Sequence, residues 1–185
     1  MTRDMSAAPP FSYRVKVGQI SHNALEIRIE ADDGERAALA RFWDIVSVEA
    51  LSAELKLRRW KKDGVKVFGI VHAKVTQACV VTLEPVPEVI DEDVDETLVP
   101  EGSPLARIPA NDQGEIMIDA EGPDLPAPFT GDAIDVGAIV AEIVAMALDP
   151  YPRKPGVAFE NHIEGNPKDD VKPSPFAVLK TLKGE

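Results

Sequence analysis

The sequence predicts an α+β domain: an antiparallel, strongly bent or barrel-like sheet with one main packed helix, and a mobile C-terminal tail that ends in a short helix. Three observations predict it. Early segments alternate apolar and polar residues, Asp63-Gly64 separates two of them as in a hairpin, and one broad apolar stripe with helical period follows late in the chain. We expect residues 1–10 to be disordered, 11–153 to form the single domain, and 154–185 to be a flexible tail.

The first half of the chain is expected to hold most of the sheet. Alternation predicts strands at 11–17, 25–31 and 53–60, a short helix at about 35–43, and a short strand or connection at 45–48. Asp33 is the expected cap of that helix, with Ala38, Leu39 and Phe42 on its apolar side. The return strand after the hairpin is so long, at roughly 3.3 Å per residue, that a bend or bulge is expected near Gly69.

The second half is expected to begin with an acidic, proline-rich loop region at about 84–130. Residues 84–101 hold eight acids and no base, and the valines between them leave an exposed edge strand as the alternative. A short strand is expected at 116–118. Asp135 then caps the main helix, from Val136 to about Leu148, and a short amphipathic helix at 175–183 ends the tail.

The net charge of −12 is unevenly distributed. Residues 1–80 hold thirteen basic and ten acidic residues, a net of +3, whereas residues 81–185 hold seven and twenty-two, a net of −15. An acidic total argues against indiscriminate nucleic-acid binding but permits one local basic face, because salt screens exposed charges beyond about 8–10 Å. With one cysteine, no apolar run of about 18 residues and no secretion signal apparent, we expect a soluble cytoplasmic protein with no membrane partner.

The sequence offers little enzyme chemistry. It contains no glycine-rich phosphate loop, and its three histidines are far apart, so no metal site, cofactor or small-molecule substrate is predicted. Cys79 has no base that spacing can assign to it, and a small buried core residue is the better interpretation. We therefore predict that the protein is not an enzyme and has no catalytic residues.

Basic residues concentrate around the predicted hairpin, where an aromatic residue lies among them. Cations beside an exposed aromatic suit nucleic acid, because they meet phosphates while the ring stacks on an unpaired base. The simpler alternative is a charged, solvated hairpin with its tryptophan in the core. The candidate RNA-binding residues are Lys56, Arg58, Arg59, Trp60, Lys61, Lys62, Lys66 and Lys74.

Three segments, 69–86, 134–153 and 172–183, resemble in order the signatures of the YceD family, and the resemblance covers about residues 10–183. Many members carry a second cysteine three residues after the first, where this chain has Thr82, so zinc binding does not carry over. The matching motif residues are Cys79, Thr82, Leu83, Glu84, Asp135, Glu142, Pro150, Tyr151, Pro152, Arg153, Pro175 and Phe176.

The resemblance implies a bacterial, non-enzymatic factor that promotes accumulation of 23S rRNA and large ribosomal subunit assembly. Its expected partners are 23S rRNA or a large-subunit precursor, and a basic ribosomal protein. The motifs do not settle which residues touch RNA, and the basic hairpin is expected to do so because of its charge pattern. The alternative function is an acidic adaptor that holds a basic ribosomal protein or assembly factor without touching RNA. A hydrolase that uses Cys79 is the second alternative.

Overall fold

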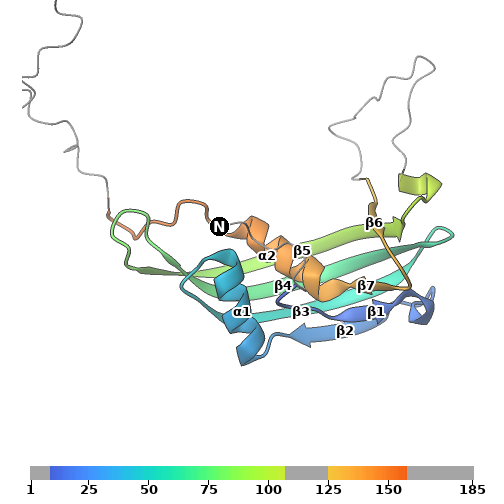
Figure 1. Ribbon diagram of the computed structural model, residues 1–185, viewed down its shortest axis with the longest axis horizontal. Coiled ribbons are helices and arrows are strands. Elements are labelled where there is room, and N and C mark those ends of the chain that lie inside the picture. The colour runs from blue at the N-terminus through green and yellow to red at the C-terminus, as the bar shows by residue number, and fades with distance from the viewer. Residues whose placement is uncertain (1–8, 107–124, 158–185) are drawn as a thin grey trace, which may run out of the picture. The chain divides into compact units, whose positions relative to one another are not determined.

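The computed structural model describes residues 9–106 and 125–157 (Figure 1). The chain divides into two compact units, 1–154 and 155–185, and only residues 155–157 of the second are described. The first unit contains β1 (Arg14–Lys16), the 3₁₀ turn η1 (Val17–Gln19), β2 (Leu25–Glu30), α1 (Asp33–Trp43), β3 (Ser47–Trp60), β4 (Gly64–Ala78), β5 (Pro85–Pro100), the 3₁₀ turn η2 (Pro104–Ala106), β6 (Ala127–Phe129), β7 (Ala133–Asp135) and α2 (Val136–Ala147).

The main sheet has five strands in the order β2-β3-β4-β5-β6. Neighbours from β2 to β5 are antiparallel, and β6 joins β5 in parallel over three residues. The α+β class and the antiparallel sheet are therefore confirmed, but the barrel is wrong. Closure needs the first and last strands to pair along their length, whereas β2 and the three-residue β6 lie at opposite edges of an open sheet.

One face of this sheet is covered by both helices, so the structure has two packed helices where one main helix was expected (Figure 1). Alternate residues of the long strands enter this face, as Leu55 of β3 and Val71 of β4 do, and both are fully buried. Leu39 of α1 and Val140 of α2 join the same apolar cluster. The opposite face of the sheet, which we call the outer face, holds the intervening polar residues.

The β3–β4 hairpin is confirmed, but Asp63-Gly64 does not form its turn alone, because Gly64 already belongs to β4. Trp60 pairs with Gly64, so three residues, 61–63, make the turn, and its left-handed residue is Lys61, at φ 50°. Gly64 is needed for another reason: a Cβ there would lie 2.8 Å from Cε3 of Trp60. The expected bulge near Gly69 is also wrong, because the register shift occurs at 48–50 of β3.

Local capping explains the boundaries of α1. The cap is Asp32, not Asp33: its carboxylate accepts from the Glu35 amide at 2.8 Å, and the Glu35 carboxylate accepts from the Asp32 amide at 2.9 Å. Phe42, which was expected on the apolar side, is 58% exposed. The first predicted strand, 11–17, shortens to β1, which pairs with β7 in a separate two-stranded sheet.

The acidic segment forms a strand. Residues 85–100, within the region expected to be loop, make the 16-residue β5. In the described part of the chain, residues 85–97 pair with β4 alone. The edge-strand alternative is the correct one there. The expected strand at 116–118, the N-terminal residues 1–8 and the helix at 175–183 lie outside the described residues.

Candidate nucleic-acid interface

The structure divides the eight candidate residues into different environments. Five of them, Lys56, Arg58, Trp60, Lys66 and Lys74, occupy the outer-face phase of β3 and β4. Arg59 has the opposite phase, and Lys61 and Lys62 lie in the turn. The hairpin therefore brings most of the candidates to one side of the molecule.

Two of these cations are already paired with acids on neighbouring strands. Lys56 Nζ lies 2.8 Å from Glu26 Oε1 of β2, and this hydrogen bond and charge lower the pKa of Glu26 and raise that of Lys56. Lys66 Nζ lies 2.7 Å from Asp95 Oδ1 of β5. The first pair is exposed and the second is half-buried on its lysine side, so water and salt weaken the first more than the second. They still reduce the positive potential that these two lysines offer a phosphate.

Two other candidates are separated from the rest by geometry. Arg59 donates from Nε to the Ile20 carbonyl at 2.9 Å, and its amide donates to the Ser21 carbonyl at 3.1 Å, so it anchors the loop before β2. Lys74 is eight residues from Lys66 along β4, roughly 26 Å at the rise of a strand. Neither residue belongs to the group at the turn.

A compact group remains at the end of the hairpin, which we call the tip cluster: Arg58, Lys61, Lys62, Trp60 and Phe68. The Arg58 guanidinium lies 5.4 Å from the centroid of the Phe68 ring, and Lys61 Nζ lies 4.2 Å from that of Trp60. These contacts are cation–π interactions, which hold the positive groups over apolar surface. Sequence analysis missed Phe68, although an aromatic residue on the polar phase of a strand was the signal for it.

The tip cluster presents cations and aromatic rings, the groups that suit a backbone phosphate and a stacked base. Arg58 stands directly opposite Lys66, an unfavourable pairing of like charges that a bound anion would relieve. Arg58, Lys61 and Lys62 have no ion pair within the described residues. A base that stacks on the face of Trp60 covered by Lys61 must displace that ammonium from the ring.

A second grouping joins two of the sequence signatures at the other end of β4. The Val80 amide donates to the Pro152 carbonyl at 2.9 Å, and the Lys154 amide donates to Cys79 Sγ at 3.5 Å. Lys154 Nζ also lies 2.9 Å from Glu84 Oε2, which lowers the pKa of that carboxyl. The loop after β4 is thereby tied to the segment after α2, 70 residues or more away in the chain.

The Cys79 thiol has an unusual environment in this junction. It is fully buried, and the Thr82 hydroxyl, with backbone N–H groups that include that of Lys154, lowers its pKa from 9.0 to about 6. No other cysteine exists in the chain to complete a thiolate metal site. The junction holds two loops together around one sulfur.

We expect the Cys79 thiol to ionise with a midpoint near pH 6 in the folded protein and near 9.0 after denaturation. The ultraviolet absorbance of the thiolate measures this titration. Since folding lowers this pKa, the group stabilises the protein fully above about pH 9 and loses that contribution as the pH falls to about 6. Thr82→Val should raise the midpoint, and Cys79→Ser, the control, should abolish the signal. A folded-state midpoint near 9.0 would contradict this assignment.

The remaining motif residues are structural or exposed. The Asp135 carboxylate caps α2 through the Ala138 amide at 3.1 Å, as expected. Pro152 is buried, whereas Glu142 and Tyr151 are exposed. Leu83 occupies the left-handed region at φ 60° in the turn after β4. Pro150 and Arg153 stand on either side of Tyr151 and Pro152 in the sequence, and both are exposed. Pro175 and Phe176 lie outside the described residues.

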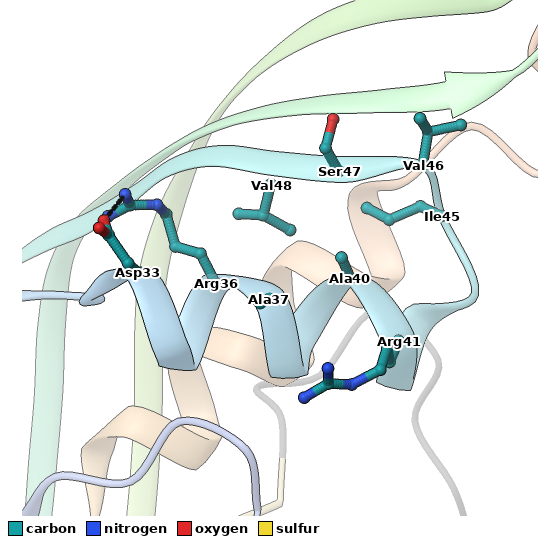
Figure 2. A pocket seen from close by; sticks show the side chains of 9 residues that line it. All are labelled: Asp33, Arg36, Ala37, Ala40, Arg41, Ile45, Val46, Ser47 and Val48. Atoms are coloured by element: carbon teal, nitrogen blue, oxygen red, sulfur yellow. Dashed lines mark hydrogen bonds and ion pairs between the residues drawn. The ribbon is translucent and has the colours of Figure 1, made fainter.

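A hollow between α1 and the start of β3 gathers none of the candidate residues (Figure 2). The guanidinium of Arg36, which lines this hollow, already has partners: Nη1 donates to the Ala31 carbonyl at 2.7 Å, and Nη2 pairs with Asp33. Arg41 points away from β3. The rest of the lining is Ala37, Ala40, Ile45, Val46, Ser47 and Val48, which offers no acid–base pair.

The residues that the structure describes, 9–106 and 125–157, contain neither a membrane-spanning helix nor a metal cluster. No helix there has the length and apolar character needed to cross a lipid bilayer. In the same segments, no three His, Cys, Asp or Glu side chains gather where they could hold a metal ion.

The fold and its surfaces define a small α+β protein with an open sheet, a charged outer face and a cationic, aromatic hairpin tip. The chain belongs to the YceD family, because the model described as "Large ribosomal RNA subunit accumulation protein YceD" matches residues 67–183. No curated protein and no solved structure matches the chain. The match begins after the turn, so of the tip cluster only Phe68 falls within it.

Proposed function

We propose that this chain is a non-enzymatic factor that promotes 23S rRNA accumulation and large ribosomal subunit assembly, and that it contacts rRNA through the tip cluster. The family supports the rRNA role. The RNA contact is supported by one observation: Arg58 and Lys61 are held over aromatic rings at the end of a hairpin, without acidic partners among the described residues.

The charges around the tip limit where RNA can lie. Strand β5 presents Asp91, Asp93 and Asp95 on the outer face, two strands from β3. Their field repels phosphates, so the extended backbone of RNA is directed over the turn and away from the middle of the sheet. The proposed RNA contacts are therefore confined to the turn and its adjacent residues. This site is narrower than the eight candidate residues suggested.

A salt titration against a large-subunit rRNA fragment tests the contact. Replacing Arg58, Lys61 and Lys62 together by alanine should weaken binding by roughly tenfold or more at about 0.1 M salt, and should reduce the slope of log K against log salt by about two units. Lys74→Ala is the matched control, because this exposed lysine shares the face but lies far from the tip. An unchanged slope in the triple variant would remove the tip from the proposal.

The cellular role is tested separately. Cells that lack the protein should accumulate less 23S rRNA relative to 16S rRNA, and the Lys74→Ala variant should restore the ratio. If the triple variant restores it as well, the protein acts on rRNA accumulation without the tip. Crosslinking in cells, followed by sequencing of the attached RNA, would then identify the contact directly.

A second candidate function, the acidic adaptor, is favoured by β5. Among the described residues, 85–97 of this strand pair on one side only, and an extended basic segment could add to the open side. Changing Asp91, Glu92 and Asp93 to their amides should then abolish binding of a basic ribosomal protein and leave rRNA affinity unchanged. The acids within β5 are Glu88, Asp91, Glu92, Asp93, Asp95 and Glu96.

A further inference from the structure

Strand β2 forms an edge of the sheet whose other side meets no strand within the described residues. The Ala31 amide donates to the Leu51 carbonyl of β3 at 2.9 Å. Hydrogen-bonding directions alternate along an antiparallel strand, so the odd-numbered residues of β2 bond to β3. The amide and carbonyl groups of Glu26, Arg28 and Glu30 therefore point outward along the edge, ready to pair with another strand.

The side chains on this edge are exposed and alternate in sign. Glu26 and Arg28 are 69% and 70% exposed on the outer face. On the other face, Leu25 and Ile27 are only half-buried at the margin of the apolar core. A shallow hollow lies along the same stretch and is lined by Glu26, Ile27, Arg28, Glu54, Leu55 and Lys56.

We infer that β2 pairs antiparallel with β2 of a second copy of this chain, about a two-fold axis at Ile27. In this register Glu26 stands opposite the partner's Arg28, and Arg28 opposite the partner's Glu26. Both residues have the outward hydrogen-bonding groups, so each pair exchanges two backbone hydrogen bonds. Centring the axis on Glu26 or Arg28 would place like charges opposite each other, which disfavours those registers.

The pairing also extends the charge pattern already present within one copy. Lys56 pairs with Glu26 at 2.8 Å, and Arg28 with Glu54 at 3.5 Å. Across the axis, each row then reads Lys56, Glu26, the partner's Arg28 and the partner's Glu54, so signs alternate without interruption. On the inner face, Ile27 meets the partner's Ile27, and Leu25 meets the partner's Ile29, which removes apolar surface from water. The result is one continuous sheet through two subunits.

Two single charge reversals test this register. Glu26→Arg makes positions 26 and 28 both positive, and Arg28→Glu makes both negative, so each variant alone should place like charges opposite each other. Sedimentation equilibrium from about 5 to 500 µM should show a reversible dimer for the unaltered chain and a dissociation constant raised by about tenfold or more for each variant. Mixing the two variants should restore a dimer with one copy of each, because their charges complement.

Lys74→Glu is the control: it reverses an exposed charge on the same face, two strands from the edge, and should leave the dimer intact. Far-ultraviolet circular dichroism checks that every variant is folded. A monomeric unaltered chain at the highest concentration, dimers of undiminished affinity in the single variants, or a mixture that stays monomeric would each overturn the inference.

Discussion

Replacing Gly69 by alanine is expected to lower the free energy of unfolding by about 4 kcal/mol, a large part of what a domain of this size has. A Cβ at this position would lie 2.0 Å from the Glu54 carbonyl oxygen and 3.0 Å from the Leu55 Cα. Both are backbone atoms of β3, which is held between β2 and β4. No side-chain rotation can relieve the overlap, so a strand must shift and ladder hydrogen bonds must break.

Urea unfolding, followed by circular dichroism, measures this change. Gly18→Ala is the matched control, since a Cβ there meets no atom within 4 Å, and it should alter stability by no more than about 0.5 kcal/mol. Equal midpoints for the two variants would show that β3 and β4 do not approach each other at Gly69 as described.

Asp135→Ala should destabilise the protein by about 3 kcal/mol. The carboxylate accepts from the Ala138 amide at 3.1 Å as the cap of α2, from the Tyr13 amide at 2.9 Å and from the Ser12 hydroxyl at 2.6 Å. A cap contributes about 1 kcal/mol, and hydrogen bonds to a charged group contribute about 1.5–3 kcal/mol. The substitution removes the helix cap and the side-chain hydrogen bonds to residues 12 and 13 together, while the β1–β7 backbone pairing remains.

Thermal and urea unfolding check this prediction, with Asp132→Ala as the control. Asp132 is exposed, and its backbone carbonyl accepts a hydrogen bond from the Val17 amide. Truncating its side chain leaves that bond in place and should have little effect on stability. If Asp135→Ala were as stable as Asp132→Ala, Asp135 would not join the helix to residues 12–13.

Elements defined by neighbouring residues were predicted well. The β3–β4 hairpin, the main helix and its Asp135 cap follow from patterns within a few residues. The Asp32 cap could also have been predicted from the sequence, because Glu35 stands three residues later, as a capping box requires. The exposure of Phe42 could not be predicted from the sequence, since only the packing of α1 on β3 decides which side of the helix is buried.

The candidate site was predicted in part, because charge density along the chain does not say which charges are free. Lys66 loses much of its positive field to Asp95, 29 residues later, and Lys56 to Glu26, 30 residues earlier. The Arg59 side chain donates a hydrogen bond to the Ile20 carbonyl and so anchors the loop before β2. Phe68 joins the site because β4 places it beside Arg58.

By itself, the sequence determined the α+β class, the alternation that makes each long strand two-faced, the hairpin and the family. These depend on interactions over a few residues and on composition. The tertiary structure alone decided that the sheet stays open, that Cys79 lies against the Lys154 amide, and which cations remain available at the tip. Such outcomes depend on strand register and on contacts between distant residues, because the field at any point sums over all neighbouring strands.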